Sequence, residues 1–152
     1  MSYNPYQSNE LRIPSRHREQ VRSYTRSQTE SYRTSEVDDS PFERYIDMWF
    51  AGLCLAANIG QRSKVDDPHK FHTGVVLTQD PYRIDLIEIV AIADTGAPWV
   101  IKDSGQVITI ANEYAAAGLS RLLSMLQEGG EKPIWNLTTE VIEEFGVGER
   151  AA

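Results

Sequence analysis

Two stretches of the chain are apolar around most of a helical circumference, and this feature limits what the chain can fold into. Between Tyr45 and Ile59, apolar residues occupy both faces of the helix that their spacing predicts, with Asp47 and Asn58 as exceptions. The stretch Val107–Leu119 has the same character. A helix of this kind must be surrounded by other elements, because its apolar surface is unfavourable in water. The chain must therefore build a packed helical core.

The spacing of apolar residues, together with start and stop signals, predicts about four helices. Ser40 is a good N-cap, Pro41 suits the first helical turn and Glu43 completes a capping box, so the first helix is expected from Pro41. The β-branched residues of the second helix also permit a strand, but its Asp80-Pro81 start favours a helix. The predicted helices cover residues 41–62, 81–93, 104–127 and 137–145, and short extended pieces are expected at 75–77 and 99–101. The predicted fold class is mainly α, a compact bundle of about four helices with short irregular or extended connections.

The first 36 residues differ in composition from the rest of the chain. They are rich in Ser, Arg, Tyr, Gln and Thr, and their few apolar residues, Leu11, Ile13 and Val21, do not repeat at helical spacing. Such a segment buries too little apolar surface to offset the entropy lost on ordering. We therefore expect a disordered arm over residues 1–36 that is dispensable for folding, a helical domain over 37–148 and a flexible tail over 149–152.

Charge divides along the same boundary. Residues 1–36 hold six Arg and four Glu, a net charge of +2, which leaves −9 for the remainder of a chain whose formal net charge is −7. An acidic body repels nucleic acid, so any contact with it must use the arm. Arginine pairs with phosphate, and both arginine and tyrosine stack on bases. The candidate nucleic-acid residues are Arg12, Arg16, Arg18, Arg22, Arg26 and Arg33. Because Glu residues dilute this charge, a solubilising or partner-docking tail is the favoured interpretation.

The segment from Asp66 to His72 is the nearest approach to a metal site. Asp67, His69 and His72 are ligand types for divalent metals, and the two histidines at i and i+3 would converge on one ion if this turn were helical. The standard zinc-ligand spacings are absent, so a polar loop is the favoured interpretation and no cofactor is expected. A small metal-dependent enzyme using this loop remains an alternative.

Other catalytic patterns find little support, so an enzymatic role is not favoured. The chain lacks the nucleophile elbow and the glycine-rich phosphate loops. The one cysteine, Cys54, lies among apolar residues, and such surroundings raise the pKa of a thiol and make it unreactive.

Asn112 and Glu113 are a polar pair that interrupts the most apolar helix. Buried polar groups need hydrogen-bond partners. The favoured interpretation is an internal hydrogen bond that ties this helix to another element. A polar contact across a subunit interface and a ligand pocket are the alternatives.

The excess of apolar helix surface leads to the main functional hypothesis. A domain of about 110 residues fully surrounds roughly one helix, whereas two here are apolar on all sides. We therefore expect a non-enzymatic interaction subunit of a larger assembly, which contacts a protein partner or another copy of itself, unless the connections 63–80 and 95–103 cover the surplus. The candidate interface residues are Met48, Trp49, Phe50, Ala115 and Gly118. The alternative is a nucleic-acid-associated accessory protein, in a setting such as a bacterial or phage DNA-transaction complex.

The cellular setting is inferred from what the sequence lacks. A lone cysteine forms no intrachain disulfide, and the N-terminus has no apolar signal segment. The longest nearly uncharged apolar stretch, Met48–Ile59, is too short to span a bilayer. These features predict a cytoplasmic protein without membrane contact.

Overall fold

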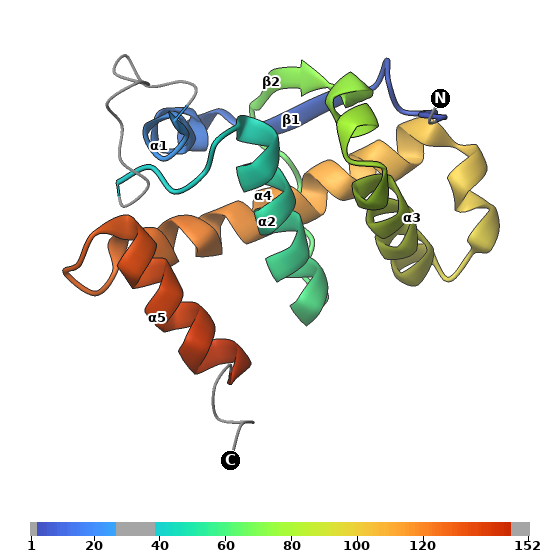
Figure 1. Ribbon diagram of the computed structural model, residues 1–152. Helices are drawn as coiled ribbons and strands as arrows, with labels where there is room; N and C mark the ends of the chain where they lie inside the picture. The colour runs from blue at the N-terminus through green and yellow to red at the C-terminus, as the bar shows by residue number, and fades with distance from the viewer. Residues whose placement is uncertain (1–2, 27–38, 147–152) are drawn as a thin grey trace.

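The computed structural model describes residues 3–26 and 39–146, and in these residues the chain is mainly helical with one small sheet (Figure 1). The mainly helical prediction is confirmed, whereas a compact four-helix bundle is not. The predicted disorder at residues 1–2 and 27–36, including Arg33, and the predicted tail over 149–152 lie outside the described residues. No described helix is long and apolar enough to cross a membrane. The elements are β1 (Glu10–Pro14), η1 (Ser15–His17), α1 (Arg18–Ser23), α2 (Tyr45–Ile59), β2 (Pro68–Thr73), η3 (Gly74–Gln79), α3 (Pro81–Thr95), η4 (Pro98–Lys102), α4 (Ser104–Gln127) and α5 (Pro133–Phe145).

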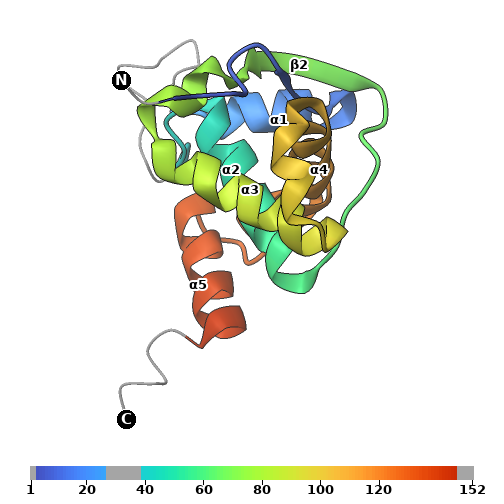
Figure 2. The ribbon, with the colours of Figure 1, turned by 90° about the vertical axis from the view of Figure 1, so that its right-hand side faces the viewer.

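The long helix α4 is the centre of the fold. It packs against α2, α3, α5 and β1, and buried side chains follow it along most of its length. Its start is fixed locally, because the Asp103 side chain accepts a hydrogen bond from the Gln106 backbone N–H at 3.1 Å. Figure 2, turned by 90°, shows that α5 points away from the rest of the molecule, as it also does in Figure 1.

The two helices that are apolar on all sides cover each other. Gly52 of α2 and Gly118 of α4 meet at their crossing, where a Cβ added to Gly118 would overlap the Gly52 carbonyl group. The absence of both side chains lets the backbones approach closely and buries Met48 and Trp49. This close crossing therefore removes much of the apolar surface of both helices from water.

The first of the predicted helices begins later than its sequence signals indicate. Helix α2 starts at Tyr45, and the Arg44 backbone N–H donates to Asp47 Oδ2 at 3.0 Å to form the cap. Ser40 is not an N-cap, because its hydroxyl donates to the Ser23 carbonyl at 2.9 Å. The Ser40-Pro41 pattern does not start a helix, because the Ser40 hydroxyl bonds a residue of α1 instead of the backbone of the turn that follows it.

The predicted disorder of the N-terminal segment is wrong over residues 3–26. Tyr6, Leu11, Ile13 and Val21 are buried to 1% exposure or less. Strand β1 pairs antiparallel with β2, a segment for which we predicted a loop. The composition argument failed because the partners of these residues lie on distant elements, which a local count of apolar residues does not detect.

Two predicted extended pieces are instead short 3-10 helices. Residues 75–77 belong to η3 and residues 99–101 to η4. Asn4 fixes η3 to the N-terminal segment, because its Nδ2 donates to the Gly74 carbonyl and to Thr78 Oγ1, both at 2.9 Å.

Candidate functional site

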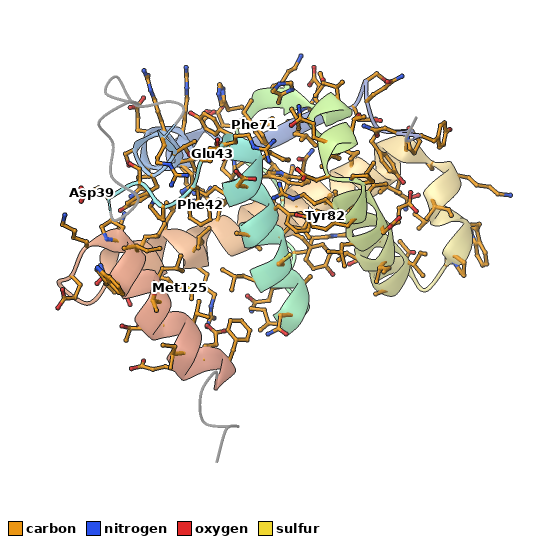
Figure 3. All side chains as sticks on the ribbon, viewed as in Figure 1. Asp39, Phe42, Glu43, Phe71, Tyr82 and Met125 are labelled. Carbon is orange, nitrogen blue, oxygen red and sulfur yellow. The ribbon has the colours of Figure 1, made fainter. Side chains whose placement is uncertain are left out.

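An open apolar groove lies between α2 and α5, and residues of α4 also line it. Its volume is about 430 Å³, within the range of ligand-binding pockets. Among the described lining residues, Asn58 alone has a polar amide or charged side chain. The groove, as named from here on, is lined by Phe42, Ala51, Cys54, Leu55, Asn58, Leu122, Met125, Leu137, Val141 and Phe145. Phe42 and Met125 are labelled in Figure 3.

The attachment of α5 leaves the groove open. Asn136, the buried residue of α5, donates through Nδ2 to the Leu126 carbonyl at 2.9 Å and accepts from the Glu131 backbone N–H at 3.0 Å. These bonds fix the turn from α4 into α5. Nearer the other end of α5, Glu144 forms an ion pair with Arg121 of α4 at 2.5 Å. Helix α5 is thus held to α4 while its stripe of Leu137, Val141 and Phe145 faces the groove.

Cys54 places a thiol in this groove. The residue is exposed, but burial of the sulfur raises the pKa of the thiol, and the charge of Arg83 only partly opposes this. The raised pKa favours the protonated thiol at neutral pH, as its apolar neighbours predict, and this disfavours the nucleophilic thiolate.

The structure corrects the predicted interface. Met48, Trp49, Ala115 and Gly118 lie inside the chain, at the contact of α2 with α4, where a partner does not reach them. Phe50 is half-buried, with the Arg83 guanidinium 4.9 Å from its ring centroid. Other residues of the same two helices, such as Leu55 and Leu122, line the groove, whereas most large exposed apolar side chains lie on other elements, such as Ile89 of α3 and Trp99 of η4.

Asn112 has the internal role predicted for it. Its Oδ1 accepts from the Arg12 backbone N–H at 2.9 Å and from Trp49 Nε1 at 3.2 Å, and its Nδ2 donates to the Glu10 carbonyl at 3.1 Å. The amide thereby bonds the edge of β1 that does not face β2, as a neighbouring strand would do. One side chain joins α4, β1 and α2.

Glu113 also has partners within the chain. Its carboxylate accepts from Arg62 Nε at 2.9 Å, and Arg62 reaches Asp94 of α3 as well. Tyr114 donates to the same Asp94 carboxylate at 2.8 Å. These contacts connect the segment after α2 to α3 and α4, so Glu113 links elements within the chain.

The structure corrects the polar loop that is predicted for the 66–72 segment. Residues 68–73 form β2 rather than a helical turn, so His69 and His72 project from opposite faces of a strand. Asp67 precedes the strand with φ of 45°, and its carbonyl accepts from the Ser15 backbone N–H at 3.0 Å. Within residues 3–26 and 39–146, no three His, Cys, Asp or Glu side chains are grouped closely enough to hold a metal ion.

The arginines of the N-terminal segment do not act as one unit. Arg12 pairs with Glu10 at 2.5 Å, Arg16 lies 3.8 Å from Asp66, and Arg26 donates to the Ser40 carbonyl at 3.1 Å. Arg18 and Arg22 line a depression of about 210 Å³ together with Tyr45, His69, Lys70 and Phe71.

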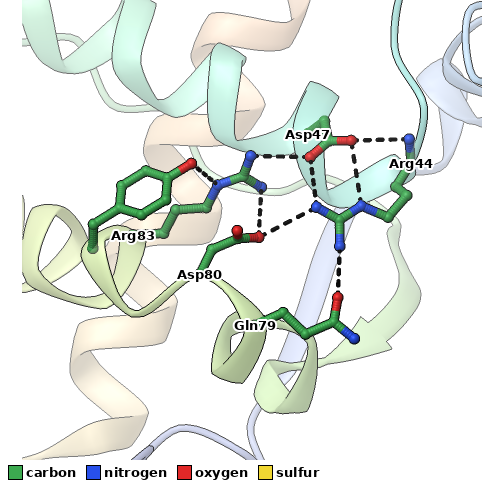
Figure 4. Close-up of polar contacts among 6 residues, drawn as sticks. Arg44, Asp47, Gln79, Asp80 and Arg83 are labelled. Atoms are coloured by element: carbon green, nitrogen blue, oxygen red, sulfur yellow. Dashed lines mark hydrogen bonds and ion pairs between the residues drawn. The ribbon is translucent and has the colours of Figure 1, made fainter. Parts of the chain in front are cut away.

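A charged cluster at the start of α2 and α3 is structural (Figure 4). Asp47 accepts from Arg44 at 3.1 Å and from Arg83 at 3.0 Å, and Asp80 lies 3.2 Å from Arg44. Burial raises the pKa of Asp47, but the hydrogen bonds from both arginines outweigh it and the net pKa is lowered. Two arginines thus balance two aspartates and connect α2 to α3, and the lowered pKa of Asp47 favours its ionised carboxylate.

Comparison with known proteins does not add to this picture. A scan against protein-family models finds no match, and searches of curated proteins and of solved structures find none either.

Proposed function

We propose that this protein is a non-enzymatic interaction subunit that binds an amphipathic helix of a partner protein in the groove. The apolar lining of the groove carries this proposal. Three helices contribute to it, and its exposed apolar side chains include Phe145, which is 38% exposed. Apolar clefts between helices commonly accept the apolar face of another helix, whose anchors recur at i, i+3, i+4 and i+7.

Charge around the groove indicates the chemistry of the partner. Glu140 and Glu144 lie beside the stripe of Leu137 and Val141 at helical spacing, and Glu143 is exposed on the same helix. Arg121 neutralises Glu144 alone. A partner helix with Lys or Arg flanking its apolar anchors complements this acidic edge. Another copy of this chain would bring a second acidic α5 against the first, which disfavours self-association through the groove.

Cys54 provides a direct test, because the only thiol of the chain lines the groove. The probe is a synthetic amphipathic helix of about 18 residues, or five turns, with leucines on one face and lysines elsewhere. We expect this peptide to slow the alkylation of Cys54 at mildly alkaline pH. The same peptide with glutamates in place of lysines should protect the thiol far less.

Two protein variants complete the test. Val141→Arg places a charge in the groove and should abolish the protection. Ile89→Arg introduces the same charge on α3 at a residue that is 59% exposed and outside the groove, and should leave protection unchanged. Equal protection by both peptides, or protection that survives Val141→Arg, would contradict the proposal. A dimer seen by light scattering and dissociated by Val141→Arg would show that the groove binds a second copy instead.

A further inference from the structure

The side of α3 that faces solvent is apolar along the helix. Tyr82, which is labelled in Figure 3, is 55% exposed, Leu86 is 41% and Ile89 is 59% exposed, and Ala93 is exposed as well. These residues follow one another at intervals of four, three and four, which places them in one line along a helix. The α3 stripe, as named from here on, consists of Tyr82, Leu86, Ile89 and Ala93.

The opposite side of α3 is also apolar, because it faces the core. Ile84, Ile87 and Ala91 are buried there, and Val90 and Ile92 are half-buried between the two sides. A surface helix ordinarily carries charged or polar residues on the side away from the core. The exposed fractions show that the described part of the chain leaves the α3 stripe uncovered. Contact with another surface would remove the stripe from water, and this favours association.

The charged residues of α3 lie outside the stripe. Arg83, Glu88 and Asp94 are bonded to α2, to the N-terminal segment and to α4, respectively. Asp85 alone has no such bond within the described residues, and its helical spacing from Tyr82 and Ile89 places it at the edge of the stripe. The stripe itself therefore has no charge with which to select a partner of opposite sign.

We infer that the α3 stripe binds the same stripe of a second copy of the chain, with the two α3 helices antiparallel about a twofold axis between Leu86 and Ile89. In a twofold contact the residue pairs are reciprocal, so the surface must be complementary to itself. The intervals of four, three and four residues read the same from either end. The reversed helix therefore places Tyr82 opposite the partner's Ala93, and Leu86 opposite the partner's Ile89.

The side chains that meet in this arrangement fit one another in size and charge. The large ring of Tyr82 meets the single methyl group of the partner's Ala93, and Leu86 meets a side chain of similar volume. No charged residue lies in the stripe, so the contact does not bring like charges together as two copies of the acidic α5 would. The two Asp85 side chains lie at its edge, roughly 8 Å apart along the helix axis, where solvent and salt screen their repulsion. These properties favour a second copy as the occupant.

The strength of this contact depends on its size and on the charge of the whole chain. One pair of helices is a small interface compared with the roughly 800 Å² per partner of a standard one, so we expect a reversible dimer with a dissociation constant on the order of 10 μM. Each copy has a formal net charge of −7, and the two copies repel each other. Because salt screens this repulsion, the fraction of dimer should rise with ionic strength.

The test is the mass of the full chain in solution, measured by sedimentation and light scattering over a range of concentrations around the expected dissociation constant. The average mass should rise from 17.2 kDa toward twice this value. Ile89→Arg places two like charges beside the twofold axis and should return the protein to the monomer mass. Val141→Arg is the matched control, because it adds the same charge on α5, which lies on the other side of α2 from α3 (Figure 1), and it should leave the dimer intact.

Disulfide crosslinking tests the antiparallel arrangement in a Cys54→Ser background, which has no other thiol. In the proposed dimer, residue 89 lies roughly 5 Å along the axis from its copy, within reach of a disulfide, whereas residue 82 lies roughly 17 Å from its copy. Mild oxidation should therefore link Ile89→Cys into a covalent dimer and leave Tyr82→Cys unlinked. Both residues are exposed, so the fold should tolerate the changes, and thermal melts by circular dichroism verify this.

Three results would overturn the inference. The first is a monomer at every concentration, and the second is a dimer that persists in Ile89→Arg or is dissociated by Val141→Arg. The third is equal crosslinking of Ile89→Cys and Tyr82→Cys, which a parallel contact would give.

Discussion

Two glycines set the distance between α2 and α4. A Cβ at Gly52 would lie 3.0 Å from the Leu119 backbone nitrogen, and one at Gly118 would overlap the Gly52 carbonyl group. Small residues in this part of α4 predict a close approach by another helix, and the structure shows that helix to be α2 of the same chain. The glycines are needed for their lack of a side chain, because both lie within regular helices.

The variant Gly118→Ala tests this crossing. The added methyl group must push α2 and α4 apart and disturb the buried side chains around them, so we expect a loss of about 3 kcal/mol or more in the free energy of unfolding. Gly105→Ala, in the first turn of the same helix, meets only Asp103 Oδ1 at 3.6 Å. It should be neutral or stabilising by up to about 1 kcal/mol, because alanine favours a helix over glycine. Urea denaturation measures both, and similar stabilities for the two variants would refute the argument.

At the scale of elements, local signals predicted the helices and missed the sheet. The observed bounds of α4 coincide with the predicted ones, since its Asp103 cap and its apolar spacing are both local. The partners of β1 lie more than fifty residues away in β2, whose polar residues show no apolar alternation. Asn112 illustrates the same limit, because its need for partners was predictable but the backbone of β1 as partner was not. The groove could not be predicted from the sequence, because it depends on the angle between α4 and α5.

The bonds of Asp47 to Arg44 and Arg83, which connect α2 to α3, predict that the stability of the protein depends on pH. The pKa of Asp47 is held below its ordinary value of 3.8 by Arg44 and Arg83, despite the opposing effect of burial. A lowered pKa contributes stability that is fully present above the ordinary value and is lost as the pH falls through the value in the folded state. We expect Asp47→Asn to lose about 2 kcal/mol at neutral pH and to show a shallower loss of stability below pH of about 4 than the wild type.

Thermal melts of both proteins between acidic and neutral pH measure this difference. Asp85→Asn on α3 is the matched control, since Asp85 is exposed. Parallel pH profiles for wild type and Asp47→Asn would show that the cluster does not contribute through its charge.

At the scale of the whole molecule, the N-terminal segment contributes buried side chains to the core that the helices form in part. The Tyr6 hydroxyl donates to Glu88 of α3 at 2.8 Å, β1 lies on α4, and His17 Nε2 lies 3.1 Å from Ser120 Oγ of α4. The division of the chain into a basic arm and an acidic body is therefore one of composition and not of structure over residues 3–26. The groove depends on this arrangement, because its lining includes Phe42, which forms a β-bridge with Thr25 of the N-terminal segment.

Deletion of residues 1–26 should therefore abolish cooperative folding, contrary to what composition alone predicts. It removes the buried side chains of Tyr6, Leu11, Ile13 and Val21, each worth about 1.5–3 kcal/mol or more in apolar burial, and their sum rivals the roughly 5–15 kcal/mol of a typical domain. It also leaves the amide of Asn112 without its two bonds to β1. Deletion of residues 1–3 is the control, because Tyr3 is 86% exposed, and it should leave the melt unchanged. A cooperative melt in the longer deletion, close to that of the wild type by calorimetry, would show that α2, α3, α4 and α5 form an independent core.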